Sequence, residues 1–403
     1  ILTGTLHQLN DLVIVRVELV DTREPGILWA TEYTYEIGDI IAMQGQITLE
    51  IVQAMRLGLS ERERVSLDRQ PTLNNAANDA YLKACYFLEY SRFHVDGNEA
   101  LGKAISCLNE AIALDPAFGL AYVKKAEVLN KRAFSLTSKE DYKISRDLVE
   151  KAVLVDENLA EAHKLLALKL AFDDHDWQKA EREMKRAQEL NPNLLPSFAY
   201  LLWLGRRAEA VRAIERKLEL SDRHSADAQS LAAFEFYMAR EFDRAVESAD
   251  AAIELDPSAR PSYIKILCLE ATGMYTEAAE EDLIGRERWG GAPPERLAVL
   301  KATFVESGWV GLRRLELEIR KKLEGSPLGK PYDIAGGYAS IGDMDEAFEW
   351  LNRAFELPIG APVPTDARFD PIRADPRYEG FLHNMNLPEE VIARHLASVK
   401  KSP

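Results

Sequence analysis

The sequence predicts a mainly α-helical protein, in which a solenoid of antiparallel helix pairs follows a small α/β unit. Two phrases carry this prediction: AISCLNEAIALDP at residues 104–116 and AVESADAAIELDP at 245–257 place small residues at the same offsets before a closing Leu-Asp-Pro. Self-similarity at a period of about 20–50 residues is typical of stacked repeats. The first 58 residues lack the phrase and contain an alternating apolar pattern, as a half-buried strand does.

The α/β unit is predicted to contain three strands and one helix. In LVIVRVELV at 12–20 every second residue is apolar, and residues 2–9 are the expected hairpin partner because Asn10-Asp11 suits a tight turn. ILWATEYTYE at 27–36 predicts the third strand. An amphipathic helix is predicted over 38–58 from apolar residues that recur at steps of three and four: Ile40, Met43, Ile47, Ile51 and Met55.

The sequence also predicts where the parts of the chain begin and end. The chain opens on ILTGTLHQL without an initiator Met, so we expect the α/β unit of residues 1–58 to be truncated at its N-terminus. Residues 59–77 are polar, charged and contain Pro, which predicts a linker. Residues 78–358 then form the solenoid. Residues 359–403 are expected to cap its last repeat, because a terminal repeat otherwise exposes an apolar face.

Five copies of the closing phrase align, at intervals of 41, 35, 30 and 35 residues. They end at Leu114-Asp115-Pro116, Val155-Asp156-Glu157, Leu190-Asn191-Pro192, Leu220-Ser221-Asp222 and Leu255-Asp256-Pro257. Twelve residues before each closing position stand Ala104, Ser145, Ala180, Ala210 and Ala245, and five residues before it stand Ala111, Ala152, Ala187, Lys217 and Ala252. Small side chains allow two helices to approach closely, and Asp or Asn followed by Pro ends one helix and begins the next.

Each such second helix has a matching first helix. The first helices read DAYLKACYFLEY, LAYVKKAEVLN, EAHKLLALKLAF, DAQSLAAFEFYM and YDIAGGYASIG. In the last unit Ala335 and Tyr338 precede Ala347, Leu351 and Ala354 at the same offsets. This pattern resembles the tetratricopeptide repeat (TPR) over about residues 78–358. It implies a right-handed superhelix of at least six helix pairs, with degenerate pairs at 194–222 and 273–325.

The two ends of the chain resemble segments that flank such repeats in bacterial multi-domain signalling proteins. At the N-terminus the resemblance rests on Gly4, Leu6, Val15, Val17, Leu19, Val20, Asp21, Leu28, Trp29, Ala30, Tyr33, Asp39, Ile40 and Gln44. At the C-terminus it rests on Phe369-Asp370-Pro371, Arg373, Asp375-Pro376-Arg377 and Leu387-Pro388. The resemblance implies an upstream winged-helix DNA-binding domain, nucleotide cyclase or Ser/Thr kinase, and this sequence contains none of them.

Composition excludes several classes of function. A net charge of −16 argues against direct nucleic-acid binding, which needs clustered Lys and Arg. The sequence contains neither a signal peptide nor a run of about 18 apolar residues. We therefore expect no membrane span and a cytoplasmic location, with the periplasmic part of a membrane-anchored regulator as the alternative. Cys85, Cys107 and Cys268 are widely spaced, which predicts free thiols rather than disulfides or a zinc site.

The sequence lacks the motifs of a catalytic, nucleotide-binding or cofactor-binding site: GxxxxGK[ST], GxGxxG, HExxH and GxSxG. We therefore expect no enzyme activity, no cofactor and no metal. DDHDW at 173–177 contains candidate metal ligands, but we interpret it as a polar turn with Trp177 packed between helices. His163 is interpreted as a packing histidine. Arg373 and Arg377 are available for an anionic partner or, in our preferred interpretation, belong to the cap.

The expected function is non-catalytic binding of a protein or peptide partner, or of an output domain of the same chain, at the concave face formed by the first helices. The candidate contact residues are Lys83, Tyr86, Lys124, Asn130, Lys131, Lys164, Phe234 and Tyr237. Two alternatives stay open: a small-ligand sensor, and the C-terminal region of a nucleotide cyclase or kinase whose catalytic domain lies outside this chain. A purely structural spacer is a third interpretation.

Overall fold

The three predicted strands form one antiparallel sheet in the computed structural model of the chain. They are β1 (Leu2–Leu9), β2 (Leu12–Asp21) and β3 (Gly26–Glu36), in the order β1-β2-β3, and the register pairs Leu6 with Val15 and Val15 with Tyr33. Val13, Val17 and Leu19 are buried, so the alternating face of β2 is the packed face. The strand prediction is confirmed.

The structure describes residues 2–9, 12–21, 26–36, 46–47, 50–54, 71–91, 97–136, 138–221, 225–256, 262–288, 293–324, 329–355 and 363–399. Of the helix predicted over 38–58, residues 46–47 and 50–54 are helical, and the rest lies outside the described residues, as does most of the predicted linker. The hydroxyl of Tyr33 donates to Glu50 Oε2 at 2.7 Å, and that of Tyr35 donates to Gln46 Oε1 at 2.6 Å. These bonds join the helical residues to the sheet.

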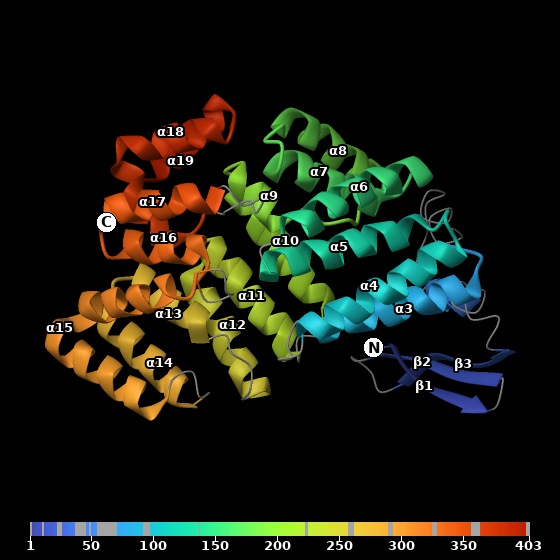
Figure 1. The fold of residues 1–403 in the computed structure, drawn as a ribbon. Coiled ribbons are helices and arrows are strands. Elements are labelled where there is room, and N and C mark those ends of the chain that lie inside the picture. The colour runs from blue at the N-terminus through green and yellow to red at the C-terminus, as the bar shows by residue number, and fades with distance from the viewer. Residues whose placement is uncertain are drawn as a thin grey trace. The chain divides into compact units, whose positions relative to one another are not determined.

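After the sheet, the described chain is helical, apart from an isolated bridge between Glu324 and Gly329 (Figure 1). The first helices are α3 (Asn75–Tyr90), α5 (Gly119–Leu136), α7 (Ala160–Phe172), α9 (Phe198–Trp203), α11 (Ala226–Met238), α13 (Ser262–Ala271) and α16 (Pro331–Ser340). The second helices are α4 (Gly97–Leu114), α6 (Lys139–Val155), α8 (Trp177–Leu190), α10 (Arg207–Leu220), α12 (Phe242–Leu255), α14 (Tyr275–Arg288) and α17 (Met344–Phe355). The segment α15 (Pro294–Lys321) precedes α16 and consists of two helical stretches separated by a kink at Gly308, whose φ is 63°.

The chain divides into two compact units, each of which has its own core. Unit 1 comprises residues 1–128 and 151–157, and unit 2 comprises 129–150 and 158–403. In unit 1, α3 packs against α4 through Ala80, Ala84, Leu101 and Leu108, all buried. In unit 2, α7 packs on α8, α9 on α10, α11 on α12, α13 on α14 and α16 on α17, which makes a helical solenoid.

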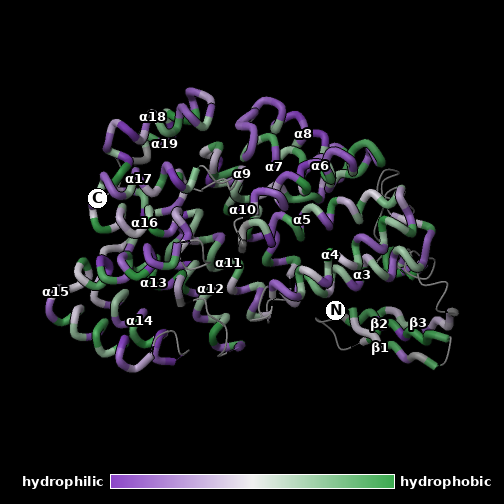
Figure 2. The backbone as a smooth tube through the Cα atoms, in the orientation of Figure 1, coloured by the Kyte–Doolittle hydropathy of each residue, from purple (hydrophilic) through white to green (hydrophobic). Residues whose placement is uncertain are grey.

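The small-residue spacing coincides with the packed side of the second helices. Ala104, Ser145, Ala180, Ala210 and Ala245 are all fully buried, and so are Ala111, Ala152, Ala187 and Ala252. Lys217 is the exception: it is half-exposed, and its Nζ lies 2.5 Å from Oε1 of the buried Glu235 on α11. Figure 2 shows hydrophobic and hydrophilic residues alternating along these helices, as their amphipathic packing requires. The spacing prediction is therefore confirmed.

The tight turn inside five of the helix pairs contains one residue with positive φ. In three pairs this residue is a glycine, Gly205, Gly273 or Gly342. In the other two it is His175 (φ 52°) and Arg240 (φ 62°), residue types that adopt this conformation at a steric cost. The turns that contain His175 and Arg240 both contact the C-terminal segment of the chain.

The C-terminal segment, residues 363–399, contains the 3₁₀ helix η2 (Ala367–Ala374), α18 (Pro376–Asn384) and α19 (Glu389–Val399). It contacts the last helix pair, where the rings of Phe355 and Phe381 lie 4.5 Å apart. It also reaches much earlier helices, since Trp177 Nε1 donates to the carbonyl of Met385 at 2.9 Å. The segment therefore packs along unit 2 and does not cover the last repeat alone.

Two further contacts join the C-terminal segment to the turns that contain His175 and Arg240. The Arg240 guanidinium makes a bidentate pair with Asp370 at 2.8 and 2.6 Å, and Asn386 Nδ2 donates to the carbonyl of His175 at 3.0 Å. Contacts at these turns offset the strain of a left-handed residue.

Candidate functional site: an aromatic cavity in unit 2

A cavity of about 660 Å³ lies among the first helices of unit 2. We call it the aromatic cavity, because eight of its lining residues are aromatic: Tyr142, Phe172, Phe198, Trp203, Phe234, Tyr237, Tyr263 and Tyr332. The other lining residues are Asn130, Leu165, Leu168, Lys169, Ala199, Met238, Leu267, Lys330, Pro331, Asp333, Ala354, Thr365, Asp366 and Arg368. The cavity is thus bounded mainly by first helices and by the start of the C-terminal segment, with Tyr142 of α6 and Ala354 of α17 completing the wall.

Helical periodicity explains why these residues share a wall. On α7 the lining residues are Leu165, Leu168, Lys169 and Phe172, which follow the spacing i, i+3, i+4 and i+7 of one helix face. The opposite face of α7 contains His163, Ala167 and Leu170, which are all buried, and α7 packs on α8. α7 therefore has apolar residues on two faces, one that lines the cavity and one that is buried in the protein.

Lys169 is the buried cation of the aromatic cavity, with 3% of its surface exposed. Its Nζ donates to Asn130 Oδ1 at 2.7 Å and lies 3.6 Å from the centre of the Tyr142 ring. Asp173 Oδ2 lies 3.6 Å from Nζ, so the two side chains form an ion pair at a distance too long for a hydrogen bond. Burial lowers the pKa of Lys169, and burial raises the pKa of Asp173.

Asp366 is the buried anion of the aromatic cavity and fastens the C-terminal segment to two helices. It accepts hydrogen bonds from the hydroxyls of Tyr237 on α11 at 2.7 Å and Tyr332 on α16 at 2.8 Å. Arg368 Nη2 donates to it at 2.7 Å. Burial acts to raise the pKa of Asp366, but the charge of Arg368 and the hydrogen bonds outweigh it, so the pKa is lowered. Asp366 is therefore an anion with its acceptor capacity in use.

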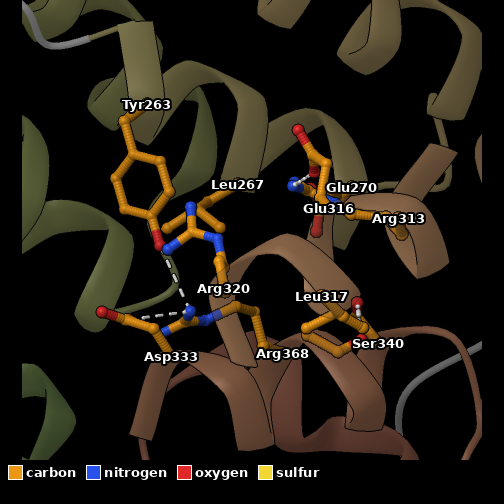
Figure 3. A pocket seen from close by; sticks show the side chains of 11 residues that line it. Tyr263, Leu267, Glu270, Arg313, Glu316, Leu317, Arg320, Asp333, Ser340 and Arg368 are labelled. Carbon is orange, nitrogen blue, oxygen red and sulfur yellow. Dashed lines mark hydrogen bonds and ion pairs between the residues drawn. The ribbon is translucent and has the colours of Figure 1, made fainter. Parts of the chain in front are cut away.

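A second, polar niche adjoins the cavity and has the size of about one water molecule, with a volume of about 20 Å³ (Figure 3). It shares Tyr263, Leu267, Asp333 and Arg368 with the aromatic cavity. Its far wall is an ionic network in which Arg313, on α15, pairs with Glu270 on α13 and with Glu316 on its own helix. Arg368 Nη1 donates to the Tyr263 hydroxyl and to Asp333, each at 3.2 Å, so this guanidinium belongs to both sites.

Three of the eight predicted contact residues meet at the aromatic cavity. They are Asn130, Phe234 and Tyr237. Phe234 is 39% exposed and its ring lies edge-on to that of Phe198. Tyr237 is 1% exposed, so it forms the floor of the cavity.

The other five predicted residues do not line the cavity. Lys131 and Lys164 belong to unit 2 but are absent from its walls. In unit 1, Lys83 pairs with Asp79 at 2.6 Å and Lys124 with Glu127 at 2.7 Å. Tyr86 is 64% exposed, with its ring beside those of Phe87 and Tyr90.

Two further residues singled out in the sequence are buried and make packing or polar contacts. Trp177 is buried, and its ring stacks on that of Trp203 at 5.8 Å, as the turn interpretation of DDHDW predicts. His163 is buried, and its Nδ1 lies 2.6 Å from Glu183 Oε2. Within the part of the chain that the structure describes, no three His, Cys, Asp or Glu side chains form a metal-binding group.

The two C-terminal arginines differ in exposure. Arg373 is buried and donates to the carbonyl of Pro364 at 3.0 Å, so it is not offered to a partner. Arg377 is half-exposed and pairs with Asp375 and Asp345. The three cysteines are free, and burial raises the pKa of Cys268 to about 12.

Sequence reasoning missed Lys169, Trp203, Asp366 and Arg368. A signal for Lys169 exists: it is the lone charged residue in the apolar series at 165, 168, 169 and 172. PSFAYLLW at 196–203 is likewise rich in aromatic residues for so short a helix. Nothing local to DARF at 366–369 indicates which helices it meets, because Tyr237 lies 129 residues away.

No protein-family model matches the chain, and no curated protein matches it. Among the solved structures that are similar is the crystal structure of the P58(IPK) TPR domain. It shares 14% sequence identity, and the comparison covers 79% of this chain and 97% of that chain with a TM-score of 0.21. The helix-pair fold is given by the contacts between consecutive helices of the chain itself. None of the described helices is both long and apolar enough to cross a membrane.

Proposed function

We propose that the chain is a non-catalytic binding and regulatory region, and that the first-helix face of unit 2 receives a compact, largely apolar group of a protein or peptide partner. The observation that carries the proposal is the aromatic cavity on that face. Its volume of about 660 Å³ lies within the range of about 300–1,000 Å³ typical of ligand pockets. Aromatic side chains bury large areas at low entropic cost, which suits them to anchor a ligand.

The predicted contact residues take different roles in this proposal. Phe234 is half-exposed at the cavity and would contact the partner directly. Tyr237 supports the floor, and Asn130 holds the ammonium of Lys169. The exposed ring of Tyr86 would anchor a longer partner at unit 1. Lys83, Lys124, Lys131 and Lys164 would steer an acidic partner.

The cellular setting is proposed from the sequence resemblance. Segments like those at both ends of this chain flank TPR repeats in bacterial signalling proteins, so we propose that partner binding biases an attached output domain in the cytoplasm. The partner is then another protein or the output domain itself. The net charge of −16 supports a partner other than nucleic acid.

Selection of peptides from a phage-displayed random library on the immobilised chain tests this function. Affinities of the selected peptides are measured by fluorescence anisotropy for the wild type, Phe234→Ala and the control Tyr275→Ala, an exposed aromatic residue on α14. Phe234→Ala should weaken binding by about 1–2 kcal/mol, as loss of an interface anchor does, and Tyr275→Ala should not. Equal binding by all three proteins would remove the cavity from the partner site.

A second candidate function, sensing of a free small ligand, is favoured by one specific observation. Asp366 and its hydrogen bonds hold the C-terminal segment across the first helices, so the hollow of unit 2 is a pocket bounded by its own chain. A bounded pocket covers most of a small molecule's surface. The same selection experiment separates the candidates, since a pocket for free ligands alone would enrich no peptide that depends on Phe234.

A further inference from the structure

We propose that the aromatic cavity binds a small organic anion with an aromatic body, and that the charged group of this ligand lies against the ammonium of Lys169. The inference rests on the proposed function in its second form, a free small ligand. It adds the chemical class of that ligand. The charged groups at the cavity wall differ in the hydrogen-bonding capacity that they have left.

Lys169 retains donor capacity. An ammonium has three N–H donors, and Nζ gives one of them to Asn130 at 2.7 Å. The Tyr142 ring faces the charge at 3.6 Å, and Asp173 forms an ion pair with Lys169 at 3.6 Å without reaching hydrogen-bond distance. A buried ammonium with N–H donors still available is stabilised when an anion accepts hydrogen bonds from them.

Two carboxylates line the cavity, Asp366 and Asp333, and the more deeply buried of them, Asp366, has no such capacity. Asp366 accepts from Tyr237, Tyr332 and Arg368, and Arg368 in turn neutralises its charge. A cationic ligand would therefore meet Asp366 with its carboxylate oxygens already hydrogen-bonded. A ligand that accepts hydrogen bonds suits this wall better than one that donates them.

A second lysine adds positive charge to the same cavity. Lys330, at the start of α16, is among the lining residues, and burial lowers its pKa. Lys169 lies on α7 and Lys330 is the N-cap of α16, so an anion between these two walls would meet positive charge on both sides. The surrounding aromatic rings would stack on a planar apolar body.

Two fluorescent probes that share one aromatic body test the charge preference. They are 1-anilinonaphthalene-8-sulfonate, an anion, and N-phenyl-1-naphthylamine, its uncharged relative. Titrations of the full chain should show saturable binding of one equivalent of the anion, at an affinity about tenfold above that of the neutral probe, as one charge-assisted hydrogen bond provides. Equal affinities, or a preference for the neutral probe, would overturn the inference while leaving an apolar binding cavity in place.

Variants then test whether Lys169 causes the preference for the anionic probe. Lys169→Met should abolish it without weakening the neutral probe, whereas Lys164→Met, on the same helix but off the cavity wall, should change neither. Ala199→Trp fills the cavity and should remove both probes. Retention of the preference in Lys169→Met, or of anion binding in Ala199→Trp, would overturn the proposal.

Two additions keep the test decisive. Melting by circular dichroism checks that each variant folds, and Lys330→Met, at a less buried lysine, should reduce the preference even if Lys169→Met unfolds. A preference unchanged in Lys330→Met would then overturn the proposal. Displacement of the anionic probe by phage-selected peptides but not by 1-naphthoate would assign the cavity to a peptide and would also overturn it. Displacement by 1-naphthoate supports it.

Discussion

At the scale of single residues, the methyl groups of buried alanines set how closely the paired helices approach. Ala252 on α12 is fully buried, and α12 packs against both α11 and α13. Ala111 on α4, which packs against α3, is likewise fully buried in the core of unit 1. A larger side chain at either position has to displace a neighbouring helix.

Ala252→Trp should therefore destabilise the protein by about 1–3 kcal/mol or more, the usual cost of overpacking a closely packed core. The matched control is Glu247→Trp, which introduces the same side chain on the exposed side of α12. Urea unfolding of both variants measures the difference. A midpoint equal to that of the wild type for Ala252→Trp would show that this position is not in the packed seam.

Asp282 on α14 links the stability of the protein to pH. Burial raises its pKa to about 6, and the neighbouring charge of Glu316 adds to this. Arg286, whose Nε donates to Asp282 at 2.8 Å, and Arg313 oppose the shift. Because the pKa is higher in the folded protein than in the unfolded chain, the contribution of Asp282 is fully present below about pH 3.8 and is lost as the pH rises through about 6.

Asp282→Asn should remove this dependence. The free energy of unfolding of the wild type, relative to that of the variant, should increase as the pH falls from about 7.5 to about 5, because only the folded wild type takes up the additional proton in that window. Denaturant titrations of both proteins at the two pH values give this difference. A difference that is constant with pH would contradict a raised pKa at Asp282.

At the scale of elements, the C-terminal segment depends on a small number of buried polar contacts. Asp366 joins η2 to α11 and α16 through Tyr237 and Tyr332. Burial raises the pKa of both tyrosines and Asp366 raises it further, so both hydroxyls remain hydrogen-bond donors over the ordinary pH range. The segment is thus held by charge and hydrogen bonds, in addition to the buried side chains of Phe369 and Ile372.

Asp366→Asn should destabilise the protein by about 3–5 kcal/mol, because it leaves the guanidinium of Arg368, whose side chain is only 10% exposed, without its main counter-charge. Asp345→Asn, which removes the highly exposed partner of Arg377, is the control and should change stability little. Thermal unfolding followed by circular dichroism compares the two. Equal effects of the two substitutions would mean that Asp366 does not fasten the segment.

The helices themselves were largely predictable from the sequence, because local rules determine them. Ala180 and Ala187 mark the packed side of α8, and Asn191-Pro192 ends that helix; both signals lie within one helix length. It was harder to predict which side of each first helix faces the cavity. The sequence prediction names Lys164 on α7, whereas the lining face is that of Leu165, Leu168 and Lys169, one residue further on. A one-residue error rotates the predicted face by about 100°.

At the scale of the whole molecule, sequence reasoning did not reach the contacts that hold the C-terminal segment against the earlier helices of unit 2. The bond between Trp177 and Met385 spans 208 residues, and that between His395 and Trp203 spans 192. No local pattern encodes such a pairing, since each partner needs only to be an ordinary apolar or polar residue at its own position. The repeat pattern predicted a cap on the last helix pair, and the structure shows contacts along unit 2 as well.

The central claim is that the first-helix faces of unit 2 and the start of the C-terminal segment together enclose one ligand cavity. Hydrogen exchange of the full chain, followed by mass spectrometry with and without saturating 1-anilinonaphthalene-8-sulfonate, tests it most directly. The claim predicts slower exchange in α7, in α11 and in residues 363–368 on binding, with α14 unchanged. Slower exchange in α14 alone, or in none of these segments while the probe is bound, would contradict it.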